Sequence, residues 1–135
     1  MEISEFYIKL LRGKGPTVIS VVALDGTIQS SLVWSEYEEG LISIPMQLGI
    51  PKLKRLKRNN MATVLKVDPE SEENYISLRC SLVKVEPEGA IERLNNLTQR
   101  HMGKETWYGE VVPDNDVEKE KEVTVYLKPE KIYFT

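Results

Sequence analysis

Along most of this chain, apolar and polar residues alternate with a period of two, which predicts β-strands. Two such runs flank Asp25-Gly26, the dipeptide best suited to a tight two-residue hairpin turn. The stretch "EYEEG" predicts another turn into "LISIPM", so we expect three consecutive antiparallel strands here. Later strands are predicted at "MATVLKV", "YISLRCSLVKV" and "VTVYLKPEKIYFT". We expect the second of these to bend and the third to contain a turn at Pro129. The stretch "DPESEEN" is typical of a polar loop.

Three segments show helical spacing instead. Residues 3–11 place five large apolar side chains on one face: Ile3, Phe6, Tyr7, Leu10 and Leu11. Pro51 suits the first position of a second helix, which Leu53 and Leu56 would anchor. A third helix is predicted with Pro87 in its first turn and Gly103 as its stop. Its apolar face would hold Ile91, Leu94 and Leu97.

These elements predict a mainly β protein with short helices. About six short strands and two or three helices are typical of an antiparallel barrel with helices at its ends. The segment "KETWYGEVVPDNDVEKEKE" shows no periodicity and reads as an irregular acidic stretch. We find no internal repeat or linker, so residues 1–135 are expected to form a single domain.

Composition restricts the class of protein further. The 135 residues are 41% hydrophobic and 29% charged, with a net charge of −3, as expected of a globular chain. The single cysteine, Cys80, lies in a strand and is expected to be a small buried hydrophobe. No Cys/His group has metal-ligand spacing, so no metal site is predicted. Neither a signal peptide nor an apolar run of ~20 residues is visible, so we expect a cytoplasmic protein without a membrane segment.

Positive charge is concentrated in "IPKLKRLKRNN", where five cations fall within seven positions: Lys52, Lys54, Arg55, Lys57 and Arg58. They could form a solvated helix face, a nucleic-acid patch, or a site for one small phosphate ligand. Neither Gly49 nor Ile50 carries a capping oxygen, so the first-turn amides stay free for an anion. The acidic net charge argues against nucleic acid, but charge alone leaves the other two alternatives open.

The strands on either side of this basic segment resemble those of a known protein family. The stretch from Gly26 to Val67 resembles the core of the pyridoxamine 5′-phosphate oxidase-like family, the flavin-binding split β-barrels. Ser30, Ser31, Val33 and Trp34 match the family's second-strand motif, and Lys52 matches its helix lysine. "YISLRCSLVKVEP" and "LTQRHMGKETW" resemble two later family segments, so the resemblance covers roughly residues 14–110.

The resemblance implies a six-stranded antiparallel split β-barrel that binds FMN at a homodimer interface. By this resemblance, Lys52 would pair with the cofactor phosphate, helped by Lys54 and by the helix amides after Pro51. The segment Ser31, Leu32, Val33 and Trp34 would line the isoalloxazine ring, with Trp107 nearby, and Pro45 and Met46 would lie near the ribityl chain. The chain ends at "EKIYFT" without the family's C-terminal Arg/Trp segment for pyridoxal phosphate, so a true pyridoxamine phosphate oxidase is not expected.

The implied function is a flavin-dependent oxidoreductase acting on a small molecule that the sequence does not name. In such an enzyme the cofactor carries the chemistry, so no catalytic residue is assigned. His101, Trp107 and Tyr108 are candidates for a group near the reactive ring. The alternatives are a helix-terminal cation for His101 and loop packing at the dimer seam for Trp107 and Tyr108. Coenzyme F420 is an alternative cofactor, whose glutamate tail Arg55 or Lys57 could bind, and a non-catalytic flavin-binding module is a third reading.

Overall fold

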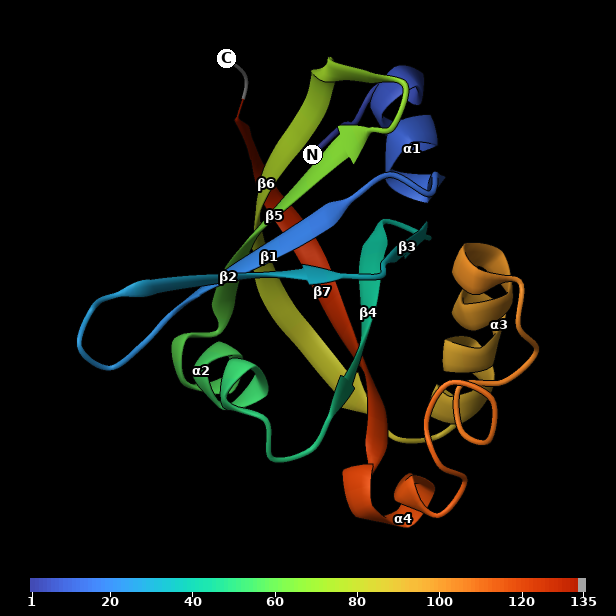
Figure 1. Ribbon diagram of the computed structural model, residues 1–135. Helices are drawn as coiled ribbons and strands as arrows, with labels where there is room; N and C mark the ends of the chain where they lie inside the picture. Colours follow the sequence, from blue (N-terminus) through green and yellow to red (C-terminus); the bar gives the residue numbers. More distant parts are fainter. Residues whose placement is uncertain (134–135) are drawn as a thin grey trace.

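The computed structural model describes residues 1–133, in which seven strands form one antiparallel sheet (Figure 1). The order across the sheet is β2-β1-β5-β6-β7-β4-β3. The strands are β1 (Thr17–Val22), β2 (Ile28–Val33), β3 (Glu36–Glu38), β4 (Leu41–Gln47), β5 (Met61–Asp68), β6 (Ser71–Glu86) and β7 (Glu122–Tyr133). This mainly β architecture confirms the predicted fold class, although the sheet has one strand more than the six expected.

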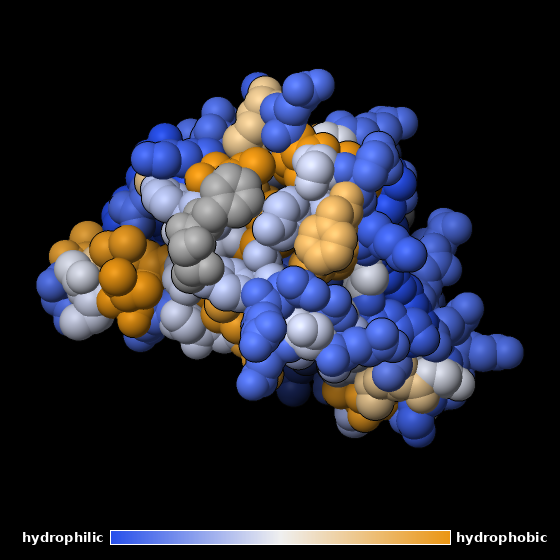
Figure 2. All heavy atoms as spheres, turned by 90° about the horizontal axis from the view of Figure 1, so that it is seen from above, coloured by the Kyte–Doolittle hydropathy of each residue, from blue (hydrophilic) through white to orange (hydrophobic). Residues whose placement is uncertain are grey.

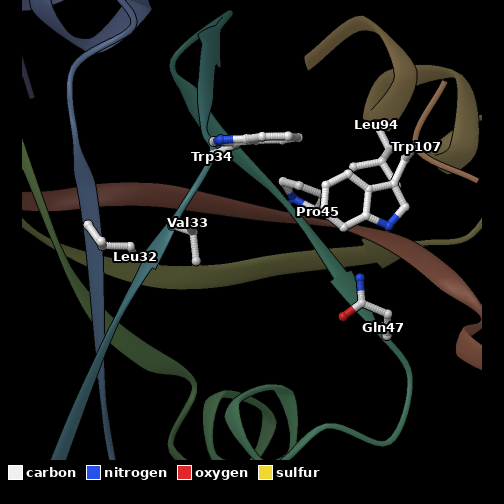
Figure 3. Close-up of a pocket in the computed structure, with 7 residues that line it drawn as sticks. All are labelled: Leu32, Val33, Trp34, Pro45, Gln47, Leu94 and Trp107. Carbon is white, nitrogen blue, oxygen red and sulfur yellow. The ribbon is translucent and has the colours of Figure 1, made fainter. Parts of the chain in front are cut away.

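The sheet curls so that β2, at one end, comes to face β4 near the other end (Figures 1 and 3). Each interior strand pairs with both neighbours, but β2 pairs with β1 alone. The interior is filled by alternate residues such as Ile19 on β1, Ile44 on β4 and Leu78 on β6, all fully buried. The barrel is therefore split between β2 and β4, and that opening is where a ligand could enter.

In residues 1–133, four helices accompany the sheet: α1 (Glu5–Arg12), α2 (Pro51–Asn59), α3 (Ala90–Met102) and α4 (Asp116–Glu120). In Figure 1, α2 lies below the start of β2, whereas α3 lies beside β4. α2 begins at Pro51 and buries Leu53 and Leu56, as predicted. No helix within residues 1–133 is long and apolar enough to cross a membrane.

Several predicted boundaries need correction. The expected third consecutive strand, β4, pairs with β7 and β3 rather than with β2. The extra strand β3 lies in "EYEEG", which was predicted as a turn; only Glu39-Gly40 turns, because Tyr37 is buried and pairs with Ile42. Most of the predicted loop "DPESEEN" belongs to β6, which begins at Ser71.

The end of the chain also differs from the prediction. β7 continues through Pro129, where a turn was expected. Pro129 lies opposite Cys80 next to a bulge in the pairing of β7 with β6, the kind of place where a strand accepts proline. The acidic segment before β7 includes the short helix α4. On α3, Leu94 and Leu97 are buried as expected, but Ile91 is 40% exposed.

The hairpin and the cysteine were placed correctly. The β1–β2 turn lies at Asp25-Gly26 but is one residue longer than predicted, because Ala23 pairs with Thr27 and leaves three residues between them. Gly26 has a φ of 86°, and the Asp25 carboxylate accepts hydrogen bonds from Thr27. Cys80 is fully buried in the core, which confirms the small buried hydrophobe that was expected, and burial raises the pKa of its thiol to about 12.

The loop before β1 packs tightly against β5 at Gly15. A Cβ at this position would collide with the carbonyl oxygen of Val67, whose N–H already bonds to Pro16. We predict that Gly15→Ala lowers the free energy of unfolding by about 1–3 kcal/mol, the cost of overpacking. Gly13→Ala is the control, because its Cβ would lie 3.3 Å from the nearest atom, the Leu10 carbonyl oxygen. Urea denaturation measures both variants, and equal effects would refute the close packing at Gly15.

Candidate functional site

A pocket of about 260 Å³ lies in the opening between β2 and β4; we call it the apolar pocket (Figure 3). β2 and the residue after it contribute one wall, β4 the opposite wall, and α3 with its following loop the lid. The lining residues are Leu32, Val33, Trp34, Pro45, Gln47, Leu94 and Trp107. Its shape and composition suit a flat, mostly apolar ring system.

Two tryptophans form the upper wall of the apolar pocket, and a histidine stacks behind one of them. The Trp34 indole stacks on the His101 imidazole with ring centroids 5.0 Å apart, and it meets Trp107 edge-on at 5.5 Å. The backbone N–H of Trp107 donates to the Asn95 side-chain oxygen at 3.0 Å, which ties the loop to α3. These contacts pack the two indoles against each other and hold the backbone of Trp107 beside α3.

A second pocket, of about 330 Å³, lies where β2 meets the start of α2; we call it the basic pocket. It is lined by Val21, Gln29, Ser30, Ser31, Pro51, Lys52 and Arg55. Ser31 lines the basic pocket and the next residue, Leu32, lines the apolar pocket, so β2 contributes residues to both pockets.

The start of α2 presents groups to the basic pocket that would favour an anion. Ile50, which precedes the helix, makes no side-chain cap, and the first helical residue is Pro51, as predicted. The N–H groups of Lys52 and Leu53 are therefore available at the positive end of the helix dipole. Partial burial lowers the pKa of Lys52, whose cation makes no ion pair within the described residues. This arrangement suits a phosphate group.

The remaining cations of α2 have other surroundings. Arg58 and Asn59 both donate to the carbonyl oxygen of Val22 at 2.8 Å, so they fasten the end of α2 to β1. Lys54 lies on the other side of the helix start, in a shallow pocket with Leu24, Gly49 and Arg58. Lys57 is exposed. The five cations of α2 therefore do not form a single solvated face with equivalent surroundings.

The sequence-predicted site residues divide into three groups. Leu32, Val33, Trp34, Pro45 and Trp107 line the apolar pocket, whereas Ser31, Pro51 and Lys52 line the basic pocket. Lys54 lies beside the basic pocket without lining it. Met46 is 1% exposed and belongs to the hydrophobic core, because side chains alternate along β4 and only Pro45 and Gln47 face the pocket.

His101 and Tyr108, both considered from the sequence, lie behind the walls rather than in them. Burial, aided by Arg100, Lys66 and Lys14, lowers the pKa of His101, which favours the neutral imidazole against Trp34. Tyr108 is buried and donates its hydroxyl to Glu120 Oε2 at 2.8 Å. Both residues support a pocket tryptophan.

A buried lysine that sequence reasoning missed lies behind Trp34. Lys66 on β5 is 1% exposed and donates to the Ser35 hydroxyl at 3.1 Å, and Ser35 lies 2.9 Å from the Thr17 hydroxyl. Burial, with a contribution from Arg100, lowers the pKa of Lys66 to about 8. Its place in the alternation of β5, two residues after Val64, was the signal that could have revealed it.

Other pocket residues were also missed. Gln47 could have been found by extending the alternation from Pro45, and Leu94 by carrying the predicted face of α3 to the site. Val21 and Gln29 belong to no recognisable sequence motif. They pair with each other in the β1–β2 hairpin, and only that pairing brings both of them to α2.

Comparison with known proteins supports this fold. No family model matches the sequence, and no curated protein matches it. Among solved structures, an F420 reductase superposes with a TM-score of 0.81 at 21% identity, covering 97% of this chain and 98% of that one. A conserved hypothetical protein from Mycobacterium tuberculosis gives 0.72 at 18% identity, with 98% and 84% covered.

A candidate pyridoxamine 5′-phosphate oxidase from Listeria innocua gives a TM-score of 0.70 at 17% identity, with 98% of this chain and 97% of that one covered. Likeness at these identities establishes the fold. The chain therefore has the split-barrel fold of the pyridoxamine 5′-phosphate oxidase-like proteins, which confirms the resemblance read from its sequence.

The lowered pKa of Lys66 predicts how the free energy of unfolding changes with pH. The unfolded lysine keeps its proton up to its usual pKa of 10.5, whereas the folded one loses it near 8, so the unfolded chain binds more protons between these values. Stability from this group therefore rises as the pH rises from about 8 to about 10.5. Lys66→Met should abolish that rise, and exposed Lys57→Met should keep it. Denaturant unfolding at several pH values tests this, and parallel curves for wild type and Lys66→Met would disprove it.

Proposed function

We propose that this protein is an oxidoreductase that binds FMN, or a deazaflavin of the same shape, with the ring in the apolar pocket and the phosphate in the basic pocket. The observation that supports the proposal most is that one strand, β2, lines both an apolar pocket and a basic pocket. A ring with a phosphate-bearing chain needs an apolar slot next to an anion site, and the chain offers both within consecutive residues.

The residues present fit such a cofactor. Val33, Pro45 and Trp107 offer apolar surface to a ring, and the edge-on packing of Trp34 and Trp107 leaves a defined slot. At the other end, Lys52 and the free amides of α2 offer charge-assisted hydrogen bonds to a phosphate. A bound dianion would also pair with the half-buried Lys52 cation and so offset the cost of burying that charge without a partner.

When bound, a flavin or deazaflavin supplies the hydride transfer. The chain's own residues bind it, orient it and exclude water from one side of the ring. His101 acts through Trp34, because the neutral imidazole stacks on the indole and does not line the pocket. The substrate would approach from the open side between β2 and β4.

Coenzyme F420 is the second candidate cofactor. The likeness to an F420 reductase favours it, and so does the shallow pocket beyond Pro51, where Lys54, Arg55 and Arg58 gather. Those cations could bind the carboxylates of a glutamate tail. Mass spectrometry of the small molecule that co-purifies, followed by turnover assays with each reduced cofactor, distinguishes FMN, F420 and a non-catalytic module.

Lys52 tests the phosphate site. We predict that Lys52→Ala weakens FMN binding by ~1.5–3 kcal/mol, the range for hydrogen bonds to charged groups. This corresponds to roughly tenfold to a hundredfold in Kd. Lys57→Ala should change Kd by less than about threefold, because an exposed cation at the far end of α2 is screened. Fluorescence titration of the apo-protein at two salt concentrations measures both. Equal, steeply salt-dependent losses would indicate a diffuse basic patch instead.

We also propose that the protein is a homodimer. Figure 2 shows hydrophobic atoms gathered on the projecting β1–β2 hairpin, where Val22, Leu24, Ile28 and Leu32 are exposed. Leu24 is 86% exposed and Leu32 is 74% exposed, which is costly in water for a monomer. Because Leu32 also lines the apolar pocket, a second subunit on the hairpin would cover the open side of the site.

Charge on the hairpin should therefore break the dimer. Ile28→Asp is expected to shift the protein to monomer and to weaken FMN binding, since an apolar interface of about 800 Å² per partner tolerates no unpaired carboxylate. Ile91→Asp, on the exposed face of α3, is the control and should stay dimeric. Light scattering over a dilution series measures this, and a wild-type monomer with bound cofactor would refute the interface.

A further inference from the structure

Gln47 stands out in the apolar pocket. Among the seven described residues that line it, Gln47 alone carries both a hydrogen-bond donor and an acceptor in its side chain. Figure 3 shows its carboxamide at the lower side of the pocket, with the oxygen turned toward the β2 side. A single amide on an otherwise apolar surface is the kind of group that fixes the orientation of a bound ring.

Glu122 holds this carboxamide from behind. The two residues pair across the β4–β7 ladder, and Gln47 Nε2 donates to Glu122 Oε1 at 2.8 Å. A carboxylate only accepts hydrogen bonds, so it orients the amide nitrogen toward itself. The side-chain carbonyl oxygen of Gln47 accepts no hydrogen bond within the described residues, so it is free for a ligand on the β2 side.

Tyr108 holds Glu122 in turn. The tyrosine hydroxyl lies 3.2 Å from Glu122 Oε1 and 2.8 Å from Glu120 Oε2, so the loop that carries Trp107 is joined to β7 and to α4. Glu122 is buried, and its second oxygen, Oε2, has no partner within the described residues. The contact therefore sets the position of two pocket residues, Gln47 directly and Trp107 through its neighbour.

From this geometry, and on the basis of the proposed function, we infer that Gln47 is a specificity-determining residue. Its carbonyl oxygen, held outward by Glu122 and Tyr108, accepts a hydrogen bond from an imide-type N–H on the edge of the bound ring. Flavins and deazaflavins carry such an N–H between two carbonyl groups in their pyrimidinedione ring. Glu122 and Tyr108 are positioning residues, because neither lines the pocket.

The protonation of Glu122 should modulate this selection. Burial raises the pKa of Glu122 to about 7, with Glu120 contributing in the same direction; Gln47 and Tyr108 oppose it. The other titratable groups facing it are Glu120 on α4 and Tyr108, whose own pKa is raised by burial so that it stays protonated. Ionised Glu122 can only accept, whereas the protonated acid can donate to the Gln47 oxygen and release the amide from its orientation.

The test compares FMN with its N3-methyl derivative, which keeps the phosphate and the ring but lacks the imide N–H. The wild-type protein should bind FMN roughly three- to tenfold more tightly, the value of one neutral hydrogen bond. Gln47→Met should bind both ligands with similar Kd values. Leu48→Met, the neighbour outside the pocket, should keep the wild-type preference.

The outcomes separate this inference from the proposed function. If the wild-type protein binds neither ligand nor reduced F420, the proposed function fails. If it binds FMN but shows the same preference in Gln47→Met, or no preference in the wild type, the role of Gln47 is overturned. Because the preference is a ratio of two Kd values in one protein, a general loss of stability does not change it.

A pH arm tests the positioning by Glu122. The preference of the wild-type protein for FMN should be greater at about pH 8 than at about pH 6, on either side of the pKa of about 7. Glu122→Gln should make the preference independent of pH. Any effect of pH on binding of the phosphate group cancels, because both ligands carry it and the preference is the ratio of their Kd values. A preference that varies with pH as strongly in Glu122→Gln would exclude Glu122 as the positioning group.

Discussion

The failure of β2 to pair with β4 is the constraint on which the site depends. A sheet of this order curls until its ends face each other, and hydrogen bonding across the gap would close the barrel and remove the pocket. Large side chains occupy the gap instead. Trp34 follows β2 directly and meets Trp107 from the loop after α3, so the opening is partly filled and keeps a slot of about 260 Å³.

The same edge strand joins the slot to the anion site. β2 passes from the start of α2 to the indole of Trp34, and its residues line first the basic pocket and then the apolar one. Attachment of the C-terminal end of α2 to Val22 fixes the helix relative to the hairpin, which leaves its free N-terminal amides at β2. The geometry of the site is therefore a consequence of how one helix is fastened to one hairpin.

Two buried ionisable groups flank the site, Lys66 behind Trp34 and Glu122 behind Gln47. Burial moves the pKa of each toward neutrality, which is costly for folding because the charged forms lose their hydration. Each also makes a hydrogen bond that orients a pocket wall: Lys66 through Ser35, next to Trp34, and Glu122 through Gln47. Shifted pKa values are common around functional sites, where the cost of burial is accepted for a fixed geometry.

Local sequence patterns predicted much of the chain. Alternation located the main strands, Asp25-Gly26 located the hairpin, and Pro51 with Leu53 and Leu56 located the start and buried face of α2, because each depends on neighbouring residues alone. Lys52 and Trp34, which were chosen because their motifs are continuous in sequence, each line one of the two pockets.

Only the tertiary structure determined how these pieces meet. β3 was too short to show a period, and the place of β4 beside β7 depends on closing a loop of about eighty residues. Met46 and Gln47 differ in role because of the face each takes on β4, which depends on the partner strand. The Gln47–Glu122 contact spans 75 positions, and the Trp34–His101 stack joins the residue after β2 to α3. Such contacts arise from the curvature of the sheet and the packing of helices on it, which no local pattern encodes.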